Sequence, residues 1–265
     1  MKLILALDLD GTVVNQFNPI SFELVDLMKE FQLKGALIAF VTGRMFSYAH
    51  IALKDLDFPY LLALQNGADI VKMPGKSIIS RSYIQVKDLQ RKLQKVQVPY
   101  ILYTGIDQGD FCYYQKNLFN KSELIYLEEL KKISVKPWRE YQAIEEVGDL
   151  SIPLVKFFGT KEELIPLELY FFEYSAKVIK DSVDPSKYIL LLTSPNASKG
   201  QVIKYLKDFK EDSFVIAAGD DRNDIPMFLE ANYSIAMPHA TEDLKKVATE
   251  TVAKSLEHSL RKFLL

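Results

Sequence analysis

The sequence predicts an α/β protein in which a doubly wound parallel sheet is interrupted by an inserted α+β domain. Short apolar runs, typical of strands buried on both faces, alternate with stretches of helical spacing over residues 3–64. Short strands of antiparallel character replace this pattern in the middle of the chain, and the first pattern returns after residue 198. We therefore expect residues 1–80 and 191–265 to form one discontinuous core domain, with residues 81–190 as a second domain.

The first expected strand is the apolar run Leu3 to Leu7, and two carboxylates follow it directly. Side chains alternate along a strand, so Asp8 and Asp10 can face one site only if the backbone turns here, which Gly11 permits. Two like charges at the end of a buried strand are costly unless a cation pairs them, and Mg2+ suits oxygen ligands. The alternative is that both carboxylates only cap a strand-to-helix turn and face water there.

Strand and helix then alternate with short links, which predicts right-handed crossovers and a parallel sheet. The expected elements are a helix over 21–34, a strand over 36–41, a helix over 45–56 and a strand over 60–64. Thr42-Gly43-Arg44 follows the second strand, and Gln65-Asn66-Gly67 follows the third. Ligands bind beyond the carboxyl ends of such strands, so these groups are expected at the same edge as Asp8 and Asp10.

The middle of the chain has a different pattern of expected secondary structure. We expect a hairpin over 70–80, helices over 86–96, 121–132 and 162–174, and strands over 100–104, 111–115, 154–159, 177–180 and 188–193. Pro166 indicates that the last of these helices starts at that residue or is kinked there. The stretch 138–149 is expected to be irregular and acidic.

The parallel pattern returns in the last part of the chain. Ser198-Lys199-Gly200 opens a helix that runs to residue 209, and a buried strand over 214–218 leads into the polar run Asp220–Asp224. The remaining expected elements are a helix over 225–230, a strand over 233–236 and helices over 242–248 and 255–264.

Composition limits the classes of function. Apolar residues make up 48% of the 265 residues and charged residues 26%, which is ordinary for a soluble globular protein. The net charge of -2 gives no basic field for nucleic acid. Cys112 is the only cysteine, so neither an intrachain disulfide nor a cysteine metal cluster is possible, and a cytoplasmic setting is the default. We reject a signal peptide and a membrane span, because the apolar runs are too short.

Four polar clusters are expected at strand ends or at a helix start: Asp8 with Asp10, Thr42-Gly43, Lys199, and Asp220–Asp224. The carboxylates would form an oxygen cage for Mg2+, while Thr42 with the following backbone amides and Lys199 suit an anion. Phosphoryl transfer requires this combination of charge neutralisation and positioning. Each motif alone has a simpler interpretation as a turn or a solvated helix start, and their occurrence together favours the chemistry.

These residues also resemble a known family. The segments similar to the four motifs of the haloacid dehalogenase-like superfamily, in its order, are Asp8-Leu9-Asp10-Gly11-Thr12, Val41-Thr42-Gly43-Arg44, Ser198-Lys199-Gly200 and Gly219–Met227. The turn Asn66-Gly67-Ala68 and the large insert resemble the Cof-type branch of cap-bearing phosphatases. The resemblance covers essentially the whole chain and implies a Rossmann-like core with an α/β cap.

The resemblance implies a Mg2+-dependent phosphatase that works through an aspartyl-phosphate. Asp8 would be the nucleophile, and Asp10 would act first as general acid and then as general base. Mg2+ would be held by Asp8, the main-chain carbonyl of Asp10, and Asp220. The residues implied in phosphate binding are Leu9, Thr42, Gly43, Lys199 and Asn223, with Arg44, Asn66 and Asp224 in supporting positions.

Some assignments stay open. Arg44 could hold the Thr42 loop or touch phosphate, and His239 stands where the branch typically has an asparagine, so we interpret it as a loop histidine. The expected substrate is a small phosphorylated metabolite, foremost a sugar phosphate, with no nucleic-acid or membrane partner, and the protein is expected to be a monomer or weak homodimer. The alternative functions are a phosphotransferase or phosphomutase on the same fold, and a non-catalytic phospho-ligand sensor, which would be expected to lack Asp8 or Asp10.

Overall fold

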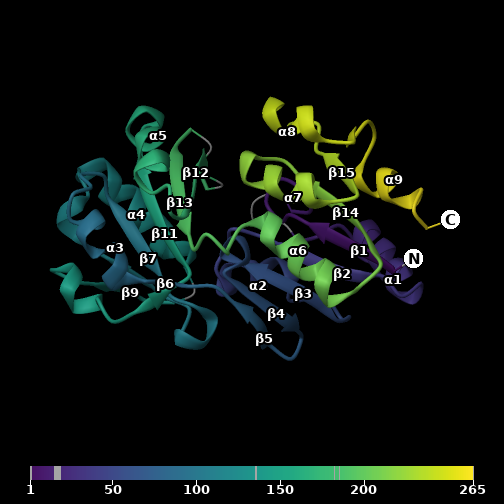
Figure 1. The fold of residues 1–265 in the computed structure, drawn as a ribbon, viewed down its shortest axis with the longest axis horizontal. Helices are drawn as coiled ribbons and strands as arrows, with labels where there is room; N and C mark the ends of the chain where they lie inside the picture. The colour runs from purple at the N-terminus through teal and green to yellow at the C-terminus, as the bar shows by residue number, and fades with distance from the viewer. Residues whose placement is uncertain (1, 15–18, 135, 182, 185, 265) are drawn as a thin grey trace. The chain divides into compact units, whose positions relative to one another are not determined.

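The computed structural model describes residues 2–14, 19–134, 136–181, 183–184 and 186–264. The chain divides into two compact units. The core unit comprises residues 1–44, 49–81 and 198–265, and the inserted unit comprises residues 45–48 and 82–197. The purple beginning and the yellow end of the ribbon in Figure 1 both belong to the core unit.

The core unit is built on an eight-stranded sheet in the described residues, with the strand order β16-β15-β14-β1-β2-β3-β4-β5. Neighbours from β16 to β3 are parallel, whereas β3, β4 and β5 pair antiparallel. The strands are β1 (Lys2–Leu7), β2 (Leu37–Val41), β3 (Tyr60–Leu64), β4 (Asp69–Met73), β5 (Ser77–Arg81), β14 (Ser213–Gly219), β15 (Tyr233–Ala236) and β16 (Glu250–Thr251). This arrangement brings the carboxyl ends of β1, β2, β3, β14 and β15 to one edge.

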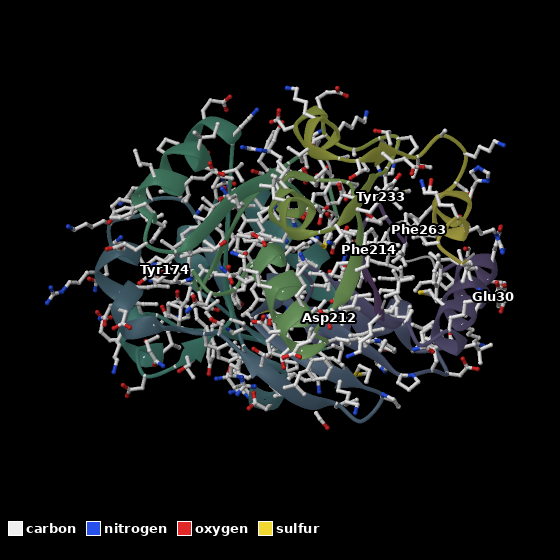
Figure 2. The ribbon with its side chains drawn as sticks, turned by 45° about the vertical axis from the view of Figure 1, so that its right-hand side comes forward. Glu30, Tyr174, Asp212, Phe214, Tyr233 and Phe263 are labelled. Atoms are coloured by element: carbon white, nitrogen blue, oxygen red, sulfur yellow. The ribbon has the colours of Figure 1, made fainter. Side chains whose placement is uncertain are left out.

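Helices cover the apolar faces of this sheet. Ile4 and Ala6 of β1 share a core with buried residues of α6 (Lys199–Phe209), α7 (Ile225–Glu230) and α8 (Glu242–Val247). Side chains alternate between the two faces of a strand, and Phe214 of β14 points to the face opposite to that core. There its ring packs against Phe263, which follows α9 (Leu256–Arg261), and Tyr233 also contacts Phe263 (Figure 2). The remaining core helices are α1 (Phe22–Leu33) and α2 (Phe46–Leu53), whose first residues group with the inserted unit.

The inserted unit contains a six-stranded sheet with the order β12-β13-β11-β7-β8-β9, in which only β8 and β9 are parallel neighbours among the described strands. Its strands are β7 (Tyr100–Tyr103), β8 (Cys112–Tyr114), β9 (Trp138–Glu140), β11 (Leu154–Gly159), β12 (Ser175–Lys180) and β13 (Tyr188–Thr193), and β6 (Ile84–Gln85) pairs with β10 (Ser151–Ile152). Residues of α3 (Val86–Leu93) and α5 (Lys161–Tyr170) pack on one face, and residues of α4 (Lys121–Ile133) on the other.

The predicted fold class is confirmed, since a parallel sheet with helices carries an α+β insertion. Two local predictions are wrong. The helix α5 does not start at Pro166, because it begins at Lys161 behind a capping box made by Thr160 and Glu163. The stretch 138–149 is not wholly irregular, since it contains β9 and a 3-10 turn over Ile144–Val147. The described helices include none long and apolar enough to cross a membrane.

Candidate active site

Asp8, Lys199 and Asp224 form a buried ion-pair cluster at the carboxyl edge of the core sheet. Asp8 follows β1, Lys199 opens α6, and Asp224 precedes α7. The Lys199 ammonium donates to Asp8 Oδ1 at 2.5 Å and to Asp224 Oδ1 at 2.6 Å. Burial opposes the charged form of the lysine, but the Asp224 and Asp8 carboxylates more than offset burial and raise the pKa of Lys199. Lys199 is therefore held as a buried cation between two carboxylates.

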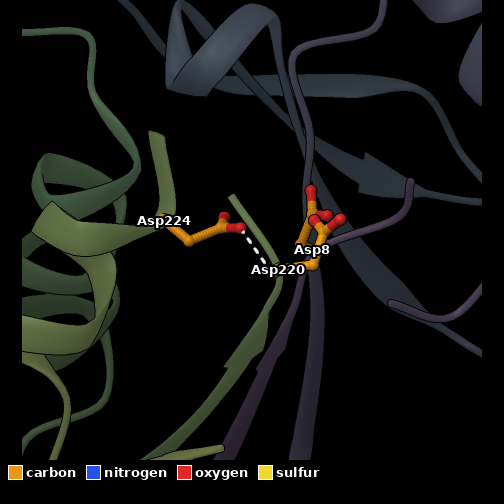
Figure 3. A group of neighbouring side chains, drawn as sticks. All are labelled: Asp8, Asp220 and Asp224. Atoms are coloured by element: carbon orange, nitrogen blue, oxygen red, sulfur yellow. Dashed lines mark hydrogen bonds between the residues drawn. The ribbon is translucent and has the colours of Figure 1, made fainter. Parts of the chain in front are cut away.

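Asp220 adds a third carboxylate to this cluster. Oxygen atoms of Asp8, Asp220 and Asp224 all lie within 4.8 Å of one another. In Figure 3 the side chains of Asp8 and Asp220 lie together, while Asp224 points to the backbone of Asp220, whose N–H donates to Asp224 Oδ2 at 2.9 Å. Burial, with Asp224 and Asp10 adding to it, raises the pKa of Asp8 to about 7 despite Lys199. Burial and the neighbouring acids, Asp8 first, raise the pKa of Asp220 to about 9.

This donor set fits a hard divalent cation. One lysine touches two of the three carboxylates, so repulsion between the acids adds to burial in raising the pKa values of Asp8 and Asp220. An oxygen-only set of this kind suits Mg2+ better than a soft metal. The residues that could hold the ion are Asp8 and Asp220, while Asp224 is already engaged by Lys199 and by backbone N–H groups.

The turn after β1 is shaped by Gly11. Its φ of +73° is a conformation that residues with a side chain rarely adopt. A Cβ atom at Gly11 would lie 2.2 Å from Asp220 Oδ2, closer than any real contact. Glycine at this position therefore allows the turn and leaves the space that the Asp220 carboxylate occupies.

Asp10 is paired with Arg44 and is not one of the three clustered carboxylates. Arg44, directly after the Thr42-Gly43 turn, donates to Asp10 Oδ2 from Nε at 2.9 Å and to Asp10 Oδ1 from Nη2 at 2.5 Å. The Arg44 side chain is 6% exposed and the Asp10 side chain 27%. From the sequence, the role of Arg44 was open between holding the Thr42 loop and touching phosphate. Neither alternative anticipated this bidentate pair with Asp10.

Two other predicted phosphate-binding residues, Thr42 and Asn223, are linked to each other through Asn66. Thr42 is fully buried, and its hydroxyl accepts a bond from the Arg44 backbone N–H at 3.1 Å. The carbonyl of Thr42 accepts the N–H of Asn66 at 2.8 Å, and Asn223 Nδ2 donates to Asn66 Oδ1 at 3.4 Å. Asn66 has a φ of +59°, which asparagine tolerates better than most residues. Leu9 and Gly43 have only backbone groups to offer an anion.

His239 lies against the site. Its Nε2 is 3.6 Å from Asp220 Oδ2, and its side chain is 56% exposed. Sequence reasoning interpreted it as a loop histidine, although it follows β15, whose carboxyl end reaches the same sheet edge as those of β1 and β14. The position of His239 directly after a parallel strand is the sequence signal that could have predicted its place at the site.

Comparison with known proteins now identifies the family. A model of haloacid dehalogenase-like hydrolases matches residues 5–264 of this chain. The chain belongs to this family. The match spans both units, so the insertion is part of the family's architecture.

Individual members of the family agree with this assignment. The 5-amino-6-(5-phospho-D-ribitylamino)uracil phosphatase YwtE of Bacillus subtilis is 26% identical over 100% of this chain and 97% of its own length. Phosphatase YwpJ of the same organism is 25% identical over 98% of this chain and 97% of its own length. These relatives confirm the predicted family and the predicted class of enzyme, a phosphatase.

Solved structures agree on the fold. A haloacid dehalogenase-like hydrolase from B. subtilis superimposes with a TM-score of 0.80 at 22% identity, covering 99% of both chains. The subclass IIB sugar phosphatase BT4131 superimposes with a TM-score of 0.77 at 19% identity, covering 99% of this chain and 100% of its own. Likeness at this level of identity concerns the fold alone.

Proposed function

We propose that this protein is a Mg2+-dependent phosphatase of small phosphorylated metabolites, with sugar phosphates as the leading class. The observation that carries the proposal is the pairing of buried Asp8 with Lys199 inside a group of three carboxylates. A carboxylate attacks a phosphate ester only if positive charge offsets the repulsion between the two anions. The names of YwtE, a phosphatase of a phosphorylated ribityl compound, and of the sugar phosphatase BT4131 support the substrate class.

In the proposed reaction Asp8 is the nucleophile. Lys199 engages Asp8 Oδ1, whereas the Thr12 hydroxyl donates to Asp8 Oδ2 at the longer distance of 3.4 Å. We assign the attack to Oδ2, which forms a bond to phosphorus as the bond from phosphorus to the leaving alcohol breaks. The product of this step is an aspartyl-phosphate, and water then releases phosphate from it. Leu9, Thr42, Gly43, Lys199 and Asn223 are proposed to hold the phosphoryl oxygens.

Asp10 is proposed to carry the protons. It gives one to the leaving alcohol and later takes one from the attacking water. The bidentate bond to Arg44 is strongest with the ionised carboxylate, so this pairing weakens when Asp10 carries a proton. Mg2+, when bound by Asp8, the Asp10 carbonyl and Asp220, supplies charge neutralisation for the phosphoryl group.

The remaining parts of the proposal concern setting and partners. We place the enzyme in the cytoplasm as a monomer or weak homodimer that acts on a free metabolite and not on nucleic acid. The net charge of -2 and the single, buried cysteine support this setting. We further propose that residues 81–190 act as the cap that selects the substrate.

Phosphate release from a panel of sugar phosphates, nucleotides and phosphorylated cofactors tests the function. The assay compares Mg2+ with EDTA, and wild type with Asp8→Asn and with Asp26→Asn, an exposed residue of α1. We expect metal-dependent release by wild type and Asp26→Asn and none by Asp8→Asn. Full turnover by Asp8→Asn contradicts the nucleophile assignment, and transfer of phosphate to an added sugar without release favours a phosphotransferase.

A further inference from the structure

His239 is anchored to the strand that presents Asp220. It lies in the loop between β15 and α8, and two backbone bonds tie this loop to the end of β14. The N–H of Met237 donates to the Gly219 carbonyl at 3.0 Å, and the N–H of Thr241 donates to the Asp220 carbonyl at 2.9 Å. Bonds on both sides of His239 therefore fix its backbone relative to Asp220.

The side chains of His239 and Asp220 meet in the space left by Gly11. His239 Nε2 lies 3.6 Å from Asp220 Oδ2. A Cβ atom built on Gly11 would be 3.2 Å from this nitrogen and 2.2 Å from this oxygen. The glycine that shapes the turn after β1 thus also lets the imidazole and the carboxylate approach each other.

Asp220 lacks the lysine that its neighbours share. Lys199 donates to Asp8 and Asp224, and the Asp220 carboxylate lies within 4.8 Å of both of these acids. In the described part of the chain, His239 is the side chain with a nitrogen within ion-pair distance of the Asp220 carboxylate. A partly buried carboxylate that lacks a hydrogen-bond donor is costly, and His239 is placed to be the donor to Asp220.

We propose that His239 is the positioning residue of Asp220, holding its carboxylate through an Nε2–H···Oδ2 hydrogen bond in the orientation that binds the metal ion. The inference rests on the proposed metal site. The two atoms need to approach by only a few tenths of an ångström to reach hydrogen-bond distance. Residues that orient metal-binding side chains typically change metal affinity by about 10- to 100-fold when they are removed.

Binding of Mn2+ alone, followed by electron paramagnetic resonance, tests the proposal without any turnover. His239→Leu removes the donor, and His239→Gln keeps an N–H at about the reach of the imidazole Nε2. His258→Leu makes the same change on an exposed histidine of α9. We expect His239→Leu to bind Mn2+ about tenfold more weakly or worse, and His239→Gln and His258→Leu to stay within about threefold of wild type.

The outcomes separate this inference from the proposed function. Equal Mn2+ affinity in wild type and His239→Leu overturns the positioning role and leaves the metal site intact. A nitrogen bound directly to Mn2+ in the wild-type spectrum, absent from His239→Leu, also overturns it, because the imidazole is then itself a ligand. No Mn2+ binding by wild type removes the metal site and the inference together. Thermal unfolding of each variant without metal shows that a weaker affinity does not reflect loss of the fold.

Discussion

Arg44 and Asp10 form the most directional ion pair at the candidate site, because two guanidinium nitrogens meet two carboxylate oxygens. Removing Arg44 leaves the Asp10 carboxylate beside Asp8 without this partner. We expect Arg44→Met to lower the free energy of unfolding by about 1 to 3 kcal/mol and to impair turnover. The double variant Arg44→Met, Asp10→Asn should recover much of that stability but no activity, as measured by urea unfolding and phosphate release. Additive losses of stability would show that the two side chains are not coupled.

Gly11 and Gly35 provide a matched pair of positive-φ glycines. Gly11 has a φ of +73° with Asp220 and His239 close to its missing Cβ, whereas Gly35 has a φ of +82° with nothing within 4 Å. Alanine at either position costs about 1 to 2 kcal/mol of stability from the backbone alone. We expect only Gly11→Ala also to weaken Mn2+ binding, because its Cβ displaces the Asp220 carboxylate. Equal metal affinity in both variants would mean that the space at Gly11 is not needed.

Motif spacing predicts which residues gather at this edge but not the partners of their side chains. Asp8, Lys199 and Asp224 meet because each stands at a strand end or helix start, which a sequence reveals. Asp10 and Arg44 meet because of the rotation of two side chains after two turns, which no periodicity encodes. The catalytic and binding roles of all these residues remain predictions.

Among the elements of the inserted unit, Asp181 after β12 is tied to Lys156 of β11. Burial alone would raise the pKa of Asp181, but Lys156, 3.4 Å away, and the Val183 N–H more than offset it, so the pKa lies below 3.8. An acid whose pKa falls on folding stabilises the fold above its unfolded pKa, and that stability is lost as the pH drops through the folded pKa. Removing one partner of a buried ion pair typically costs about 3 kcal/mol, so we expect Asp181→Asn to lower the free energy of unfolding by about that much at pH 7. The part of this loss that comes from the charge should shrink as the pH drops below 3.8.

Trp138 is the only tryptophan and lies in the inserted unit, so its fluorescence during urea unfolding can measure the stability that Asp181→Asn removes. The comparison between wild type and Asp181→Asn at neutral and acidic pH isolates the contribution of one carboxylate. A difference that is independent of pH would show that Asp181 acts through packing and not through its charge.

The strands that the sequence predicts best have a continuous apolar run, and the strands that it misses are very short. The strands at 2–7, 37–41 and 213–219 are buried on both faces, and each shows such a run in the sequence. Strands β6, β10 and β16 have two residues each, too few to show a period. Pro166 is a poor guide to the start of α5, because the capping box at Thr160 begins the helix five residues earlier, at Lys161.

At the scale of the whole molecule, the order of the motifs along the chain is sufficient to predict the fold class and the family. The motifs on the two sides of the insertion meet at one sheet edge, because β14 lies next to β1 in the sheet although residues 82–197 separate these two strands in sequence. The substrate is not predicted in this way, because the loops of the insertion, which we propose to select it, have conformations that no motif encodes. The division into a core and a cap as independently folding domains remains a prediction, and it can be tested by deletion.

The core unit should fold without residues 82–197. All eight strands of its sheet come from residues outside that segment. The Ser82 hydroxyl donates to the Ser194 hydroxyl at 2.8 Å, so the two ends of the insertion lie close together. A short Gly-Ser linker can therefore replace the insertion. The deletion also removes Asp110, which accepts the N–H groups of Phe46 and Ser47 at the start of α2, at a cost of about 1 kcal/mol.

We expect the shortened chain to keep a cooperative unfolding transition and to bind Mn2+ with near wild-type affinity, since Asp8, Asp220 and Asp224 all remain. Circular dichroism and Mn2+ titration measure these two properties separately. Because the proposed cap is what selects the substrate, the shortened chain should also lose preference among phosphate esters that the full chain distinguishes. A chain that fails to fold would show that the two units depend on each other for stability, and unchanged preference would place specificity in the core.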